Sequence, residues 1–340
     1  MTTPPPTAQP AAPERRTCGL DRSRSCRRLR RLGAILATVF VAATLFGGTI
    51  AHADEMGTLT EAQYSNAAGT RHYFLYTPPG DVAGRPLLVW LHGCMVRGFT
   101  DEEQLAGLRP DPTDNDMLAV ARERNMVVVF PIQTPASNLL GCWNFTDDAN
   151  QHRDAGEPSI IAGITETVRT QLNLDPSRTY IIGHSAGALM ATIMAAAYPD
   201  IYTAISVWCG GAYRFGTDLT GRAAFNEMGP RARPMPVLLV EDATDPKSPP
   251  LIGRLALGQW LGTDQLALGQ DTPLPNPVSV QRHNPDPDSG FDDARTLETY
   301  QLGPVQVQLL TLDDGGHELT GNGTGALWQT IDFLLQYQRP

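Results

Sequence analysis

The segment Tyr180–Met190 constrains the fold of this sequence more than any other stretch. An apolar, β-branched run leads into Gly-His-Ser-Ala-Gly at 183–187, and an alanine- and methionine-rich run follows. This pattern predicts a strand, a sharp turn with Ser185 at its apex, and then a helix. Glycines 183 and 187 are needed because side chains there would collide where the strand and the helix meet. We therefore expect a strained Ser185 whose hydroxyl rises above a sheet edge; the alternative is a structural glycine-rich turn.

Apolar runs alternate with helical patterns along the rest of the chain. We expect strands at 71–76, 86–91, 126–130, 179–182, 204–207, 237–240 and 305–310, and helices at 116–123, 160–172, 186–198, 251–261 and 327–337. Such alternation predicts an α/β fold with a mostly parallel central sheet and helices on both faces. Ligands of these sheets bind at the carboxyl ends of the strands. Two polar stretches, 218–234 and 272–293, are expected to be surface excursions.

The N-terminal region has the pattern of an export signal. A proline-, threonine- and alanine-rich start, expected to be disordered, precedes an arginine cluster, an apolar run at Leu32–Ile50 and then Ala51-His52-Ala53. We expect residues 1–53 to be a disordered N-terminus and secretory signal, cleaved after Ala53, with 54–340 as a single domain. The alternative is an uncleaved membrane anchor, and paired arginines leave twin-arginine export open. A secreted or cell-envelope location follows, with no stable membrane association after cleavage.

The charge of the chain is unevenly distributed. The first 53 residues hold eight arginines and two acidic residues, whereas the net charge of the whole chain is −10. Removing that net charge of +6 leaves −16 on the remainder. So acidic a protein argues against nucleic acid as a partner, because phosphate groups would be repelled.

The cysteines agree with export. Cys18 and Cys26 would be lost with the leader, and Cys94, Cys142 and Cys209 would remain. Three cysteines allow one disulfide and one free thiol. No Cys-x-x-Cys spacing or cysteine–histidine cluster in the sequence indicates zinc, so neither a metal nor another cofactor is expected.

An activated serine needs a general base, and the base needs an orienting acid. His317 lies just after the predicted strand 305–310 and follows two glycines, which would let its loop bring the imidazole over the sheet edge. Asp245 follows strand 237–240 and is our choice of acid, with Asp242 second. The alternatives are a solvated loop histidine and turn-forming aspartates.

Two backbone N–H groups would be needed to bind the oxyanion. We expect one from Ala186, directly after the serine, and one from Cys94, in the turn after strand 86–91.

Four segments of the sequence resemble the poly(3-hydroxybutyrate) depolymerase family of esterases, which is close to feruloyl and acetylxylan esterases. They are Leu-His-Gly-Cys at 91–94, Cys-Trp-Asn-Phe at 142–145, Gly-Glu-Pro-Ser-Ile at 156–160 and the Gly-His-Ser-Ala-Gly segment. The resemblance implies that 54–340 is one α/β-hydrolase catalytic domain, with Ser185, Asp245 and His317 as its triad. It also implies a disulfide between Cys94 and Cys142, Trp143 lining the substrate cleft, and Cys209 as the unpaired thiol.

The activity implied is hydrolysis of small esters, polyesters or polysaccharide esters by an exported serine esterase through an acyl-enzyme, as in polyhydroxyalkanoate depolymerases. The chain departs from the family pattern at Glu241-Asp242, at 318–321 and at Ala188. Two other readings therefore stay open: a feruloyl- or acetylxylan-type polysaccharide esterase, and a catalytically inactive envelope protein that binds ligands on the same fold.

Overall fold

The computed structural model describes residues 56–94, 116–216, 218–270, 272–319 and 321–340. The predicted leader lies outside the described residues, all of which belong to one compact unit. The strands are β1 (Thr58–Asn66), β2 (Gly69–Thr77), β3 (Leu87–Leu91), β4 (Val127–Pro131), β5 (Thr179–His184), β6 (Ala204–Trp208), β7 (Val237–Asp242), β8 (Ser279–His283), β9 (Arg295–Leu302) and β10 (Val305–Leu312). The helices are α2 (Asp116–Glu123), α3 (Gly156–Gln171), α4 (Ala186–Ala197), α5 (Arg222–Met228), α6 (Pro250–Ala267) and α7 (Gly323–Leu334).

The strands form one sheet in the order β1-β2-β4-β3-β5-β6-β7-β10-β9-β8. The six central strands, from β4 to β10 in this order, pair in parallel, and the two strands at each end pair antiparallel. Their parallel direction brings all six carboxyl ends to one edge of the sheet, where the predicted site residues follow them. The expected mostly parallel sheet is confirmed.

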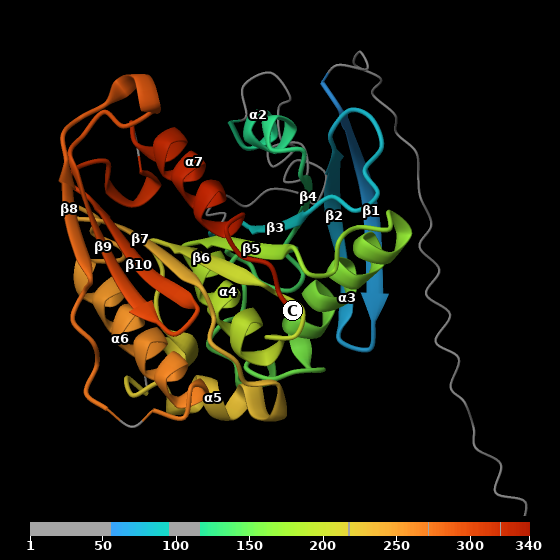
Figure 1. Ribbon diagram of the computed structural model, residues 1–340. Helices are drawn as coiled ribbons and strands as arrows, with labels where there is room; N and C mark the ends of the chain where they lie inside the picture. The colour runs from blue at the N-terminus through green and yellow to red at the C-terminus, as the bar shows by residue number, and fades with distance from the viewer. Residues whose placement is uncertain (1–55, 95–115, 217, 271, 320) are drawn as a thin grey trace, which may run out of the picture. The chain divides into compact units, whose positions relative to one another are not determined.

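Helices cover both faces of the sheet (Figure 1). One hydrophobic core contains buried side chains of α3, α4 and α6, and a second contains those of α2 and α7. All residues of α4 are buried, as expected of a helix whose sequence is apolar all round. Because the helix after the serine is fixed in the core, its first turn has a fixed position at the sheet edge.

Three strands, β1, β8 and β9, were absent from the sequence prediction. The residues of β1 are exposed or partly buried except for the buried Ala62, and most of β8 is exposed, so neither strand shows an apolar run. The strand β8 lies within the stretch 272–293, which we expected to be a surface excursion. It pairs with β9 at the end of the sheet, and together they extend the sheet beyond β10.

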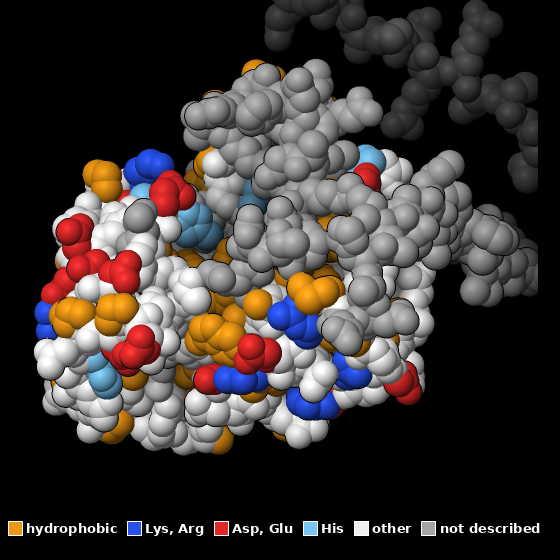
Figure 2. All heavy atoms as spheres, turned by 90° about the horizontal axis from the view of Figure 1, so that it is seen from above, with side chains coloured by type: hydrophobic (Ala, Val, Ile, Leu, Met, Phe, Trp, Pro, Cys, Tyr) orange, Lys and Arg blue, Asp and Glu red, His pale blue; other side chains and the backbone are white. Residues whose placement is uncertain are grey.

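On the face seen in Figure 2, acidic side chains gather on the side where Figure 1 shows β8 and β9, and hydrophobic side chains run across the middle. None of the helices among the described residues is long and apolar enough to cross a membrane.

Candidate active site

Ser185 occupies the expected sharp turn between β5 and α4. Its backbone has φ 55° and ψ −118°, a region that non-glycine residues rarely adopt. A Cβ on Gly183 would lie 2.1 Å from the Gly187 carbonyl oxygen, and one on Gly187 would lie 2.2 Å from the Leu91 oxygen. These contacts are shorter than any side chain tolerates, so the steric argument made from the sequence is confirmed for both glycines.

Three predicted side chains meet above the turn. The Ser185 hydroxyl lies 2.9 Å from Nε2 of His317, and Nδ1 of His317 lies 2.7 Å from Oδ2 of Asp245. The imidazole is 7% exposed and the carboxylate is fully buried. A carboxylate only accepts, so Nδ1 carries the proton and donates to Asp245. Nε2 is then free to accept from the serine hydroxyl.

The structure places Asp245, not Asp242, beside the histidine. Burial alone would raise the pKa of Asp245, but the N–H groups of Ser248 and Lys247 and the imidazole of His317 donate to its carboxylate and hold that pKa below its ordinary value. Asp245 is therefore an anion at neutral pH. Asp242 is also buried, but its Oδ1 accepts from the amide and hydroxyl of Thr244 and forms the turn.

The loop that carries His317 depends on its glycines and on a second histidine. Gly315 and Gly316 have φ 140° and 65°, conformations open to glycine, and they turn the chain sharply before His317. Nε2 of His184 lies 2.8 Å from the carbonyl oxygen of His317. Burial lowers the pKa of His184, so its neutral ring donates this hydrogen bond. Sequence reasoning found no role for His184, because its partner is 133 residues away.

The first proposed oxyanion donor is at the start of a helix. Ala186 is the first residue of α4, and the first N–H groups of a helix have no partner within it. The same end of the helix carries the positive end of its dipole, which favours negative charge.

The second proposed donor, Cys94, is positioned through His92. The Gln133 N–H donates to Nε2 of His92 at 3.0 Å, so Nδ1 carries the proton and lies 2.6 Å from the Gly93 oxygen. Burial lowers the pKa of His92 to about 4 and keeps the ring neutral. A trans peptide directs its N–H away from its C=O, so this bond also sets the direction of the Cys94 N–H. A Cβ on Gly93 would lie 3.2 Å from the Ser185 Cβ, which places this turn against the serine.

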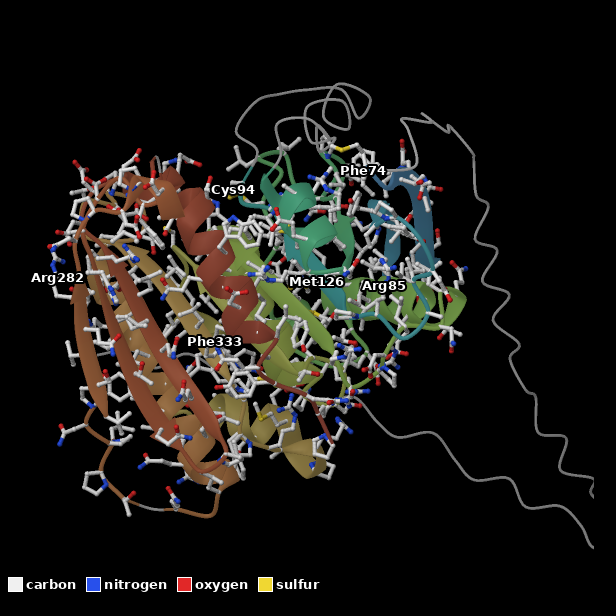
Figure 3. The ribbon with its side chains drawn as sticks, turned by 45° about the horizontal axis from the view of Figure 1, so that its top comes forward. Phe74, Arg85, Cys94, Met126, Arg282 and Phe333 are labelled. Atoms are coloured by element: carbon white, nitrogen blue, oxygen red, sulfur yellow. A yellow bond between two sulfur atoms is a disulfide. The ribbon has the colours of Figure 1, made fainter. Side chains whose placement is uncertain are left out.

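The expected disulfide joins Cys94 to Cys142 (Figure 3), and Cys209 is buried and free. The bond closes a loop of 48 residues, which in the chain-entropy model restricts the unfolded chain by about 4 kcal/mol. It also ties the Cys94 turn to the loop after β4.

The expectation that Trp143 lines the cleft is wrong. Trp143 is 1% exposed, so its indole offers no surface to a ligand. Its Nε1 donates to the carbonyl oxygen of His92 at 3.1 Å, and its ring lies 5.3 Å from the His92 ring. The ring packs in the hydrophobic core. It can be buried there because the His92 carbonyl oxygen satisfies its only polar atom.

The buried carboxylate of Glu157 links the segments 142–145 and 156–160. Its Oε1 accepts from Arg71 at 2.9 Å, from the side-chain NH₂ of Asn144 at 2.8 Å and from the side chain of Gln133. Its Oε2 accepts from the backbone N–H of Asn144 at 2.8 Å. Arg71 and Glu157 are almost fully buried, with side chains 6% and 5% exposed. Four donors thus converge on one carboxylate and hold the loop next to Trp143.

Cys209 lies beside the triad at the end of β6. Burial raises the pKa of its thiol well above the ordinary value, so the sulfur is protonated and weakly reactive. One ligand atom each of Cys209, His184 and His317 lie within 4.8 Å of one another. Both ring nitrogens of His317 already contact Ser185 and Asp245, so these residues could hold a metal ion only by breaking one of those contacts.

Comparison with protein families matches residues 71–259 to the family Esterase PHB depolymerase. This range is more than half of the 340 residues. The chain belongs to the PHB depolymerase family of esterases. The matched range includes Ser185 and Asp245 and ends before His317.

Two curated relatives match about half of the chain. Poly(3-hydroxyalkanoate) depolymerase C of Paucimonas lemoignei is 31% identical over 169 residues, which are 50% of this chain and 38% of that protein. An acetylxylan esterase of Coprinopsis cinerea is 34% identical over 161 residues, 46% of this chain and 39% of that protein. The chain therefore spans less than half the length of either relative.

Solved structures of low sequence identity share the fold. An acetyl xylan esterase of Aspergillus awamori superimposes with a TM-score of 0.56 at 20% identity, covering 78% of this chain and 93% of that one. The LpqC poly(3-hydroxybutyrate) depolymerase of Bordetella parapertussis has a TM-score of 0.51 at 18% identity, covering 82% of this chain and 89% of that one. The esterase family member described here has the α/β-hydrolase fold that its sequence resemblance implied.

Proposed function

We propose that this chain is an exported serine esterase that hydrolyses carboxylic esters through an acyl-enzyme, in the manner of a polyhydroxyalkanoate depolymerase. The observation that carries the proposal is the continuous hydrogen-bonded line from Ser185 through His317 to Asp245. An inactive binding protein would have no need of a buried carboxylate aligned on an imidazole that contacts a serine hydroxyl, so the geometry favours the enzyme.

The contacts support a two-step reaction. Nε2 of His317 takes the proton of Ser185 as Oγ attacks the ester carbonyl, and the amides of Ala186 and Cys94 stabilise the oxyanion. The imidazolium, stabilised by Asp245, then protonates the departing alcohol. Water attacks the acyl-serine in the second step, with His317 again acting as the base, and releases the acid.

Export is part of the proposal. The leader pattern at 1–53 supports it, and so does the disulfide, because such bonds persist in oxidising compartments. No metal or cofactor is required by the chemistry proposed.

An ester panel tests the proposed function. The panel consists of short p-nitrophenyl esters, 3-hydroxybutyrate oligomers, methyl ferulate and acetylated xylan. We expect hydrolysis of at least the short esters, and its loss in Ser185→Ala with unchanged circular dichroism. Failure of the wild-type protein to cleave any ester would reject the proposal and favour the binding protein.

A further inference from the structure

His184 lies between the turn that carries the proposed nucleophile and the loop that carries the proposed base. It is the last residue of β5, which pairs with β3 on one side and with β6 on the other, so the sheet holds its backbone in place. Ser185 follows it directly in the chain. The His184 side chain therefore starts from a fixed position beside the proposed nucleophile.

The loop that carries His317 has a permissive backbone and needs a restraint from outside the loop. Gly315 and Gly316 precede His317 with φ 140° and 65°. Glycine reaches many backbone conformations at little cost, so these two residues add little stiffness to the loop. The ion pair between Lys247 and Glu318, 3.1 Å apart, also joins this loop to the loop of the proposed acid. Its side chains are 63% and 68% exposed, so it holds the loop only weakly.

The His184 imidazole restrains this loop at His317 itself. Its Nε2 donates to the carbonyl oxygen of His317 at 2.8 Å, and the centroids of the two rings are 5.0 Å apart. Burial lowers the pKa of His184, so the ring is neutral and has a single N–H, which this hydrogen bond uses. Because the bond is partly buried, water competes for it less than for the exposed ion pair.

The other ring nitrogen of His184 lies against the turn that carries the second proposed oxyanion donor. A Cβ on Gly93 would lie 3.0 Å from Nδ1 of His184 and 3.2 Å from the Ser185 Cβ. Both distances are shorter than most side-chain contacts, so the turn packs closely against the ring and the serine. One imidazole, fixed to the end of β5, is therefore in contact with the segments that carry the base and the oxyanion donor.

We propose that His184 is a positioning residue of the ester hydrolysis, which holds the His317 imidazole in line between Ser185 and Asp245. The inference rests on the proposed esterase function and adds to it a residue that acts through the base. Nε2 of His317 lies 2.9 Å from the serine hydroxyl, and both steps of the reaction need a proton transfer at this nitrogen. A displacement of about 1 Å at a catalytic group can slow a reaction about a hundredfold.

The test compares His184→Met with His184→Gln in the full chain. The two replacements have nearly the same length and shape, but only glutamine has an N–H that can reach the His317 carbonyl oxygen. We expect His184→Met to lower kcat for p-nitrophenyl acetate about 10- to 100-fold with less than about a twofold change in KM, and His184→Gln to restore kcat to within about threefold of the wild type. The same two replacements at His72 are the controls. His72 lies on β2 and contacts Gln63 and Glu61, so kcat should not change.

Proton NMR gives a second readout that needs no turnover. The Nδ1 proton of His317 is hydrogen-bonded to the buried carboxylate of Asp245, so it should give a resolved low-field signal, which His317→Gln would remove. We expect this signal in the wild type and in His184→Gln. In His184→Met it should broaden or vanish, because a ring that moves away from Asp245 exchanges this proton with water faster.

Two results would overturn the inference while the proposed function stands. One is a His184→Met variant with the kcat and the low-field signal of the wild type. The other is an equal loss of kcat in His184→Met and His184→Gln, which would assign the effect to packing of the ring and not to the hydrogen bond. If His184→Met does not fold, His184→Phe, which keeps a ring against His317 but has no donor, replaces it in the comparison. Should the wild type hydrolyse no ester, the proposed function fails, and the NMR comparison still decides whether His184 holds His317 in place.

Discussion

Replacing Glu157 by glutamine tests how the loop beneath the proposed oxyanion donor is held. A glutamine keeps the shape but can place only one oxygen in the site. If the glutamine oxygen takes the Oε1 position, the glutamine NH₂ group takes the Oε2 position and faces the backbone N–H of Asn144. Two hydrogen-bond donors then face each other without an acceptor. The buried guanidinium of Arg71 also loses its counter-charge.

The expected loss of stability is large. Removing one partner of a buried ion pair costs about 3–5 kcal/mol, because the other charge stays buried and unpaired. For a domain of this size, that loss lowers the melting temperature by roughly 5–8 °C. The effect also reaches the chemistry, because Asn144 is next to Trp143, which contacts His92 at the Cys94 turn. We expect kcat to fall about tenfold with a smaller change in KM, since an oxyanion donor acts on the transition state.

Scanning calorimetry and steady-state kinetics on a p-nitrophenyl ester measure both effects. The control is Glu166→Gln in the same helix α3, where the side chain is 39% exposed and pairs with Arg169. A surface pair contributes little, so the control should change stability by less than about 1 kcal/mol. Equal melting temperatures for the two variants would refute the stabilising role of Glu157. A destabilised Glu157→Gln with unchanged kcat well below its melting temperature would refute the link to the Cys94 turn.

Three further predictions concern the triad, the turn and pH. Asp245→Asn should lower kcat about 10³- to 10⁴-fold and Asp242→Asn less than about tenfold, and the reverse order in kinetics would exchange their roles. Gly187→Ala should lower the free energy of unfolding by about 2 kcal/mol or more and abolish ester hydrolysis. The control is Gly323→Ala, whose Cβ would meet nothing within 4 Å and which should change neither the melting temperature nor the hydrolysis rate. Burial raises the pKa of Glu241 from 4.5 to about 7, so its stabilising contribution is present below about pH 4.5 and is lost as pH rises through 7. Glu241→Gln should therefore raise the melting temperature at pH 8 and change it little at pH 5, and an equal change at both pH values would contradict the assignment.

Local patterns were enough to predict the central sheet and the elements that carry the site. The buried strands are continuous apolar runs, and the glycines around Ser185 report a steric need that any such turn has. The position of His317 followed from the strand before it and from the glycines in its loop. The sequence does not separate Asp245 from Asp242, because both lie at the carboxyl end of β7 and only their hydrogen bonds distinguish them.

The features that sequence reasoning missed depend on contacts between distant residues. Trp143 was expected at the surface of a cleft, but its burial is decided by the His92 carbonyl oxygen, 51 residues away. The partners of Glu157 come from three separate segments, so no spacing in the sequence reveals that they share a carboxylate. The exposed edge strand β8 has no apolar run, and its pairing with β9 is what makes it a strand.

Covalent labelling is the most direct test of the central claim that Ser185 is an activated nucleophile. The wild-type protein is incubated with diethyl p-nitrophenyl phosphate, digested, and analysed by peptide mass spectrometry. The account predicts one diethylphosphoryl group on the peptide that contains Ser185, no label in Ser185→Ala, and slow labelling in His317→Ala. Ester hydrolysis that survives in Ser185→Ala above about 1% of the wild-type rate, or a label on another residue, would contradict it.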